Sequence, residues 1–264
     1  AANSQLEMPS FFKGVQLCLL TTIFLAIPSA AQNITPIISA LLLGDEGVLA
    51  TGLLNDTGIT FGGNYSSGNN TGCTGEIVSR QDCSNGRDVT ENDNTDGDAG
   101  FSFTKLDANG DPLADQSDDY STTPWTCVKD NVTGLVWEVK TNDASIHNFS
   151  NIYKWGGVTV LGSGYGTYHD DWDTLVNGSN ANNFCGFNDW RVPTRQELES
   201  LVHFNETSPS IDSNYFPNTS TSYWTASPSA ANSVLAWYVN FIAGTSLTSS
   251  RDNPQELRLV RSAQ

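Results

Sequence analysis

An acidic turn, residues 107–111, places the oxygen-bearing side chains of Asp107, Asn109 and Asp111 at alternate positions. This spacing can wrap the chain around a hard cation such as Ca²⁺, which takes oxygen ligands. The turn departs from an EF-hand, because Pro112 and Asp118 stand where that loop needs Gly and Glu. A solvated acidic turn without an ion is the interpretation that we favour over a Ca²⁺ site. Further carboxylates that could add ligands lie upstream, at Asp93, Asp96 and Asp98.

A second polar cluster, His169-Asp170-Asp171-Trp172-Asp173, could serve a metal ion or acid–base chemistry. We interpret it as the start of a helix, because carboxylates in a first helical turn interact favourably with the helix dipole. His147 and His203 are isolated in the sequence, and we expect them to be surface or packing residues. The sequence contains no nucleophile elbow, zinc-binding helix motif, phosphate loop or dinucleotide fingerprint, so we predict that the protein is not an enzyme.

Two turn-prone segments, 227–233 and 243–253, are our first candidates for ligand binding. Both contain small polar residues, and loops held by a rigid scaffold are where binding residues usually lie. Their side chains offer donors and acceptors for sugar hydroxyls, and we expect Trp224 to be exposed for stacking on a sugar. The predicted ligand-binding residues are Trp224, Asn232, Asn240, Thr245, Thr248 and Arg251. The acidic segment 88–119 is the second candidate.

The other large aromatic and basic side chains are interpreted as structural. Three tryptophans lie within apolar alternation or beside a predicted helix, so we expect them in the core; these are Trp137, Trp190 and Trp237. Four arginines could hold an anion, but the abundance of carboxylates favours salt bridges; these are Arg191, Arg195, Arg258 and Arg261.

Local patterns predict the elements that would position these residues. Apolar and polar residues alternate over 135–140, which indicates a strand with one buried face, and 235–241 is a second such strand. Thr194, followed three residues later by Glu197, forms a capping box and predicts a helix near 195–203. One short helix among several strands favours an α+β fold over a parallel α/β fold.

Charge and the N-terminal pattern limit the classes of function. The chain has 29 acidic residues against 12 Lys and Arg, a formal charge of −17, which argues against nucleic acid and anionic lipid as partners. Residues 8–31 have a lysine, an apolar run and then small residues, the layout of a secretory signal peptide. We therefore predict export to the periplasm, the cell surface or the medium, with no transmembrane helix in the mature chain. The predicted parts are a leader and signal at 1–31, a loop-rich acidic extension at 32–122 and the main domain at 123–264.

Four cysteines follow the predicted signal, at Cys73, Cys83, Cys127 and Cys185. An even number of cysteines in an exported chain favours disulfides. Cys73 and Cys83 are close in sequence, so closing the loop between them costs little entropy, and this leaves Cys127 to pair with Cys185. A zinc site is the rival interpretation, but no paired Cys or His spacing supports it.

Six strings in the second half of the chain carry a family resemblance. They are CVKDNVTGLVWEVKT at 127–141, CGFNDWRVPTRQELESLV at 185–202, IDSNYFPNT at 211–219, YWTASP at 223–228, AWYVNF at 236–241 and LRLVRS at 257–262. In this order they resemble the C-terminal domain family of the Legionella collagen-like protein, over residues 125–262. The resemblance implies a C-type-lectin-like α+β fold and an adhesive or ligand-binding role on or outside bacterial cells. Sulfated polysaccharides are ligands of some members.

The sequence and the resemblance together predict an exported binding module that recognises an extracellular glycan or protein through loops on a lectin-like scaffold. One alternative is a structural component of a surface filament or envelope assembly. A less favoured alternative is an enzyme of the formylglycine-generating class, which shares the fold class and uses a pair of cysteines. No cofactor is expected apart from the Ca²⁺ considered above.

Overall fold

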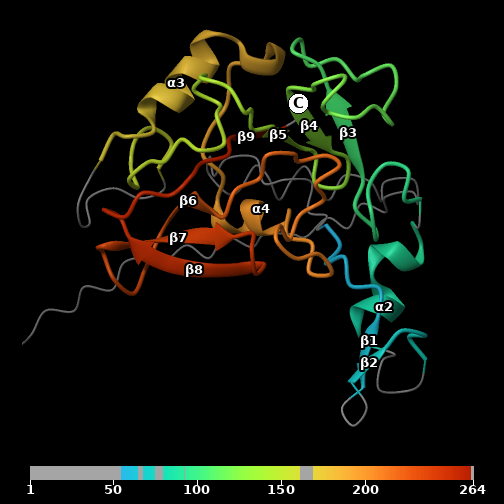
Figure 1. Cartoon of the computed structure of the whole chain (residues 1–264). Helices are drawn as coiled ribbons and strands as arrows, with labels where there is room; N and C mark the ends of the chain where they lie inside the picture. The colour runs from blue at the N-terminus through green and yellow to red at the C-terminus, as the bar shows by residue number, and fades with distance from the viewer. Residues whose placement is uncertain (1–54, 65–67, 75–79, 92, 161–168, 263–264) are drawn as a thin grey trace, which may run out of the picture. The chain divides into compact units, whose positions relative to one another are not determined.

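The computed structural model describes residues 55–64, 68–74, 80–91, 93–160 and 169–262. The predicted signal peptide lies outside these residues. The described part combines antiparallel strands with few helices, as an α+β fold requires (Figure 1). Within it, no helix has the length and apolar character needed to cross a membrane.

A four-stranded antiparallel sheet contains β3 (Phe103–Leu106), β4 (Cys127–Asp130), β5 (Leu135–Glu138) and β9 (Val260–Ser262), in the order β3-β4-β5-β9. β3 precedes residue 123, so the extension predicted over 32–122 supplies a strand to the sheet of the domain predicted over 123–264. Phe101 and Phe103 are buried in the same core cluster as Val128 and Trp137. Burying these rings favours this pairing, because each removes a large apolar area from water.

A three-stranded antiparallel sheet contains β6 (Ser222–Pro228), β7 (Leu235–Asn240) and β8 (Thr245–Ser250), in that order. The prediction of a ligand loop over 243–253 is therefore wrong for most of its length. Six consecutive residues of β8 pair with β7, from Thr245 opposite Asn240 to Ser250 opposite Leu235. The threonines suit a strand, and their polarity reflects a sheet edge rather than a loop.

The helix α4 (Arg195–Glu199) packs on β6 and β7 (Figure 1). Thr194 is its N-cap, and its side chain accepts a hydrogen bond from the Glu197 amide, while the Glu197 carboxylate accepts one from the Thr194 amide. The predicted capping box is confirmed. The helix is shorter than predicted, because Leu201 and Val202 fill the core from the turn that follows it.

Smaller elements surround the two sheets. They are the hairpin β1 (Gly62–Asn64) and β2 (Gly68–Asn70), α2 (Asp82–Asn85), the 3₁₀ helices η1 (Arg87–Val89) and η2 (Phe184–Gly186), and α3 (Asp173–Ala181). Disulfides join Cys73 to Cys83 and Cys127 to Cys185, with Cα atoms 6.0 and 6.4 Å apart. Both predicted pairings are confirmed, and the second ties β4 to η2.

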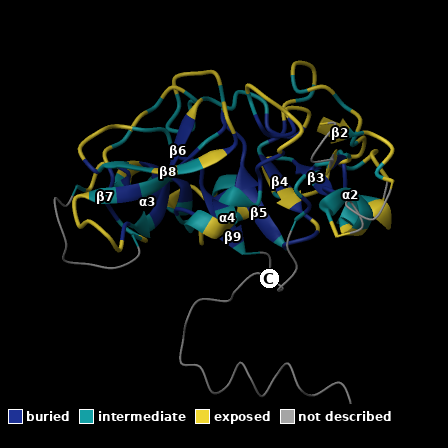
Figure 2. Ribbon diagram, turned by 90° about the horizontal axis from the view of Figure 1, so that it is seen from below, coloured by how far each residue is buried: buried dark blue, intermediate teal, exposed yellow. Residues whose placement is uncertain are grey.

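Two apolar clusters cover opposite faces of the central strands. Leu135 and Trp137 of β5 belong to one cluster, whereas Val136 between them belongs to the other. Figure 2 shows buried residues concentrated along the strands and exposed ones in the connecting loops. The prediction that 135–140 has a single buried face is wrong, because Glu138 and Lys140 are buried as well.

Candidate functional site

The residues predicted to bind a ligand do not come together as one open site. Trp224 was expected to be exposed, but it is fully buried in β6, where its indole N–H donates to the Tyr153 carbonyl at 2.8 Å. Its ring packs edge-on against Tyr238. A buried and hydrogen-bonded indole cannot stack on a sugar, so this assignment is corrected. The Ser, Thr and Pro residues around Trp224 belong to a strand rather than to a loop.

Arg251 is also structural rather than ligand-facing. It is buried, its guanidinium lies 4.2 Å from the centre of the Trp155 ring, and its Nε donates to the Leu235 carbonyl at 3.4 Å. The contact with an aromatic face and a carbonyl satisfies the cation inside the protein. The assignment of Arg251 to a ligand site is corrected for this reason.

The remaining predicted ligand residues are at least partly exposed. The two asparagines accept hydrogen bonds from nearby backbone amides, and the two threonines lie on β8. Asn232 accepts a hydrogen bond from the Val234 amide, and Asn240 accepts from the amides of Ile242 and Ala243. Thr245 is exposed at the start of β8, and Thr248 is half-buried opposite Trp237. Trp237 itself was expected in the core, but it is half-buried and stacks with Arg195 at 4.1 Å.

The acidic turn at 107–111 folds around one of its own carboxylates. Asp107 Oδ1 accepts hydrogen bonds from the amides of Asn109 and Asp111, and the Asn109 side-chain amide donates to Asp107 Oδ2. These hydrogen bonds lower the pKa of Asp107 below its ordinary value. In the part of the chain that the structure describes, no group of three His, Cys, Asp or Glu side chains could hold a metal ion. The observed contacts are hydrogen bonds within the turn itself.

The cluster at 169–173 starts α3, as predicted. Asp173 accepts a hydrogen bond from the Val158 amide, and Asp171 accepts one from the Lys154 amide. His169 lies 2.8 Å from the Asp252 carboxylate, and Trp172 is fully buried. The side chains of His169, Asp171 and Asp173 thus anchor neighbouring loops.

The four arginines expected to be structural all have internal partners. Arg191 pairs with Glu197 at 2.6 Å, Arg195 with Glu199 at 2.6 Å, and Arg261 with Asp189 at 2.5 Å. Arg258 donates instead to the Glu138 carbonyl and to the Thr219 hydroxyl. The expectation of salt bridges is confirmed for the first three.

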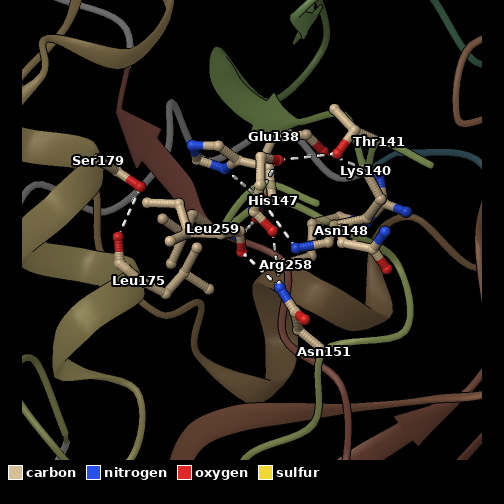
Figure 3. Close-up of polar contacts among 12 residues, drawn as sticks. Glu138, Lys140, Thr141, His147, Asn148, Asn151, Leu175, Ser179, Arg258 and Leu259 are labelled. Carbon is tan, nitrogen blue, oxygen red and sulfur yellow. Dashed lines mark hydrogen bonds and ion pairs between the residues drawn. The ribbon is translucent and has the colours of Figure 1, made fainter. Parts of the chain in front are cut away.

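A buried polar centre surrounds Glu138, and the sequence did not indicate it. Figure 3 shows Lys140 and His147 converging on this carboxylate. Lys140 Nζ and His147 Nδ1 each lie 2.8 Å from Oε1, and the Leu259 amide donates to Oε2 at 2.8 Å. Burial alone would raise the pKa of Glu138, but the Lys140 charge and the hydrogen bonds lower it to about 2. The centre joins β5 to the chain before β9, and its closed surroundings suit a brace rather than a ligand site.

An acidic cleft of about 730 Å³ opens on the described structure. It is lined by three segments, 94–98, 116–121 and 203–217, together with Lys105 and Trp125. The first two segments belong largely to the acidic stretch that was our second candidate. Five carboxylates line the cleft, at Asp98, Asp118, Asp119, Glu206 and Asp212. Only one lysine, Lys105, opposes them among the described lining residues.

One wall of the cleft is an aromatic and cationic stack. Lys105 Nζ lies 4.3 Å from the centre of the Trp125 ring and 5.1 Å from that of Tyr215, and it donates to the Asp118 carbonyl at 2.8 Å. The Trp125 indole donates to the Tyr215 carbonyl at 2.9 Å, and Tyr120 packs edge-on against Trp125. Burial raises the pKa of Tyr215 to about 12, so its hydroxyl stays protonated.

The lining of the cleft also contains Asp98, Asp212 and His203. Asp212 is buried, and burial raises its pKa although the Asn214 amide donates to it at 2.9 Å. His203 is only 1 % exposed, and among the described residues neither of its ring nitrogens has a hydrogen-bond partner. His203 Nε2 lies 3.4 Å from Asp98 Oδ2, a contact that is an ion pair only if the ring is protonated. The His203 ring stacks on Phe101, so the expectation of a packing residue is confirmed. The same ring also lines the cleft.

Comparisons with known proteins identify the second half of the chain. The family model of the Lcl C-terminal domain matches residues 126–261, which is just over half of the sequence. No curated protein matches the chain. The match runs from the start of β4 into β9 and includes the lining segment 203–217, whereas the lining segments 94–98 and 116–121 precede it.

Proposed function

The chain belongs to the Lcl C-terminal domain family, and on this premise we propose that it is an exported binding module whose ligand site is the acidic cleft. The observation that carries the proposal is the cleft itself. Its volume of about 730 Å³ lies within the range of roughly 300–1,000 Å³ typical of ligand sites. Polar side chains from three segments converge on it, as binding residues on a rigid scaffold do.

A C-type-lectin-like scaffold is part of this proposal. The family resemblance suggests it, and two antiparallel sheets with one capped helix suit a rigid frame that presents loops. The two disulfides suit a protein that works in an oxidising compartment, outside the cytoplasm. Surface exposure or secretion of the mature chain follows from the same reasoning.

The charge of the cleft narrows the class of ligand. Five carboxylates against one lysine would repel the sulfates of sulfated polysaccharides, which are ligands of some family members. We therefore propose a glycan without sulfate groups, rich in hydroxyls that can donate to carboxylates.

Two other functions receive less support. An enzyme of the formylglycine-generating class would need reactive cysteines, but all four cysteines in the described residues are bonded in pairs. A structural component of a filament or envelope assembly would need no ligand cleft. Defined filaments of the purified chain under the electron microscope would favour that alternative.

A panel of immobilised neutral, amino and sulfated glycans, probed with the full chain, tests the proposal. Ser213 is exposed on the rim of the cleft, so Ser213→Trp should block the opening without disturbing the core. We expect binding to unsulfated glycans and its loss in this variant. Binding restricted to sulfated glycans, or full binding by Ser213→Trp, would refute the proposal.

A further inference from the structure

We infer that the acidic cleft recognises a protonated amine carried by a glycan, and that Asp98 and Asp212 hold the ammonium group. The inference rests on the proposed function and names the chemical class of its ligand. Sugars with free amino groups, such as glucosamine oligomers, belong to this class.

The protein already binds one ammonium group in this cleft. Lys105 Nζ is held by a backbone carbonyl at 2.8 Å and lies over the rings of Trp125 and Tyr215. Aromatic faces and oxygen acceptors are the groups that recognise an ammonium ion. Lys105 compensates one charge, and the cleft retains a large excess of carboxylate over cation.

Two of the five carboxylates, Asp98 and Asp212, lie close to each other, and Asp212 is also the carboxylate that attracts Lys105 most strongly. Asp212 is buried, and it is close enough to Asp98 and His203 for both to influence its ionisation. Two neighbouring carboxylates repel each other and attract a cation placed between them. The side chain of Asp98 is 49 % exposed, so a ligand can reach this pair from the solvent side.

His203 supplies an observation that is independent of the acidic cluster. Gly58 covers its Nδ1 edge so closely that a Cβ there would lie 2.5 Å from Nδ1, which leaves the Nε2 edge toward Asp98. A buried polar nitrogen without a hydrogen bond costs about 1–3 kcal/mol. A ligand N–H or O–H at the Asp98 carboxylate would lie next to Nε2 and could provide the missing bond.

The rest of the lining favours a sugar as the carrier of the amine. Exposed amide and hydroxyl side chains border the cleft, at Asn94, Ser121, Ser213 and Asn214. Such groups both donate and accept hydrogen bonds, which suits the vicinal hydroxyls of a sugar ring. A glycan with free amines can form hydrogen bonds with these side chains and ion pairs with the carboxylates.

Isothermal titration of the full chain with a glucosamine trimer, at neutral pH, tests the inference. The N-acetylated trimer is the matched ligand, because acetylation turns each charged amine into a neutral amide and leaves the sugar rings and their linkages unchanged. We expect the free-amine trimer to bind at least about tenfold more tightly. Equal affinities would overturn the inference, and equally tight binding of a lysine tripeptide would overturn its assignment to a glycan.

Three variants locate the ammonium group. Asp98→Asn and Asp212→Asn should each weaken binding of the free-amine trimer about tenfold or more, whereas Asp170→Asn, an exposed acid outside the cleft, should leave it unchanged. The side chain of Asp98 is 49 % exposed, so Asp98→Asn should fold with the melting temperature of the parent. Unaltered binding by Asp98→Asn and Asp212→Asn would overturn the inference, and so would an equal loss in Asp170→Asn.

The inference and the proposed function can fail separately. If the panel yields a neutral glycan whose binding Ser213→Trp abolishes, and the free-amine trimer does not bind, the inference is wrong and the proposed function stands. If Ser213→Trp alters the binding of no glycan, the proposed function is wrong as well.

Discussion

Glu138 and Lys140 form an ion pair at 2.8 Å in which both side chains are almost completely removed from solvent. They lie two residues apart and therefore point to the same side of the extended chain. The hydrogen bonds from His147 and the Leu259 amide complete the coordination of the carboxylate. The pair therefore acts as a brace between β5 and the chain that leads into β9.

Glu138→Gln should destabilise the protein by about 3–5 kcal/mol, because it leaves the Lys140 ammonium buried without a counter-charge. Glu91→Gln, at an exposed position, should change the free energy of unfolding by less than about 0.5 kcal/mol. Urea titrations of both variants measure the difference. Similar effects at the two positions would contradict the brace.

The same pair predicts the response of stability to acid. The pKa of Glu138 is lowered to about 2 in the folded protein, against about 4.3 in an unfolded chain. Its contribution is therefore fully present above the unfolded value and is lost as the pH falls from about 4.3 toward 2. The double variant Glu138→Gln/Lys140→Met removes both charges, so its stability should fall less steeply over this range. Parallel pH profiles for the two proteins would rule out this contribution.

Thr194→Ala should cost about 1 kcal/mol, because the amide of Glu197 loses the hydroxyl that caps α4. Thr221→Ala is the control, since Thr221 is exposed and lies outside the helices and strands. We expect a negligible change there. Denaturant titrations that give equal values for the two variants would argue against a stabilising cap.

Arg251→Ala should lower the free energy of unfolding by about 2 kcal/mol, because a buried cation loses its contacts with Trp155 and the Leu235 carbonyl. Asn232→Ala, in the neighbouring exposed turn, should cost less than about 1 kcal/mol. Thermal unfolding of the two variants measures this difference in stability. A fully stable Arg251→Ala protein would return Arg251 to the list of candidate ligand residues.

Local signals predicted the elements better than they predicted the site. The Thr194 cap and the Cys73–Cys83 bond depend on residues close in sequence, and both are as expected. Glu138 is buried because apolar clusters cover both faces of its strand. The alternation of residues within one strand cannot reveal the second cluster. The small polar residues of 243–253 suited a loop equally well, and only pairing with β7 makes them a strand.

The sequence predicted only one part of the acidic cleft. The excess of carboxylates in 88–119 made this segment the second candidate. Nothing in the sequence placed it against His203 and Asp212, which lie about a hundred residues further along the chain. Such long-range contacts arise from the packing of the Phe101 and Phe103 rings into the main core.

The proposal that the cleft is the ligand site is tested most directly by a pair of serine-to-tryptophan variants. Ser213 lies on the rim of the cleft, whereas Ser233 lies in the exposed turn that the sequence first suggested as the binding loop. Both are exposed, so both variants should fold with the melting temperature of the parent. With the tightest-binding glycan of the panel, titration calorimetry should show binding lost in Ser213→Trp and retained in Ser233→Trp. Retention by Ser213→Trp with loss in Ser233→Trp would contradict the account and place the ligand on the 229–234 turn.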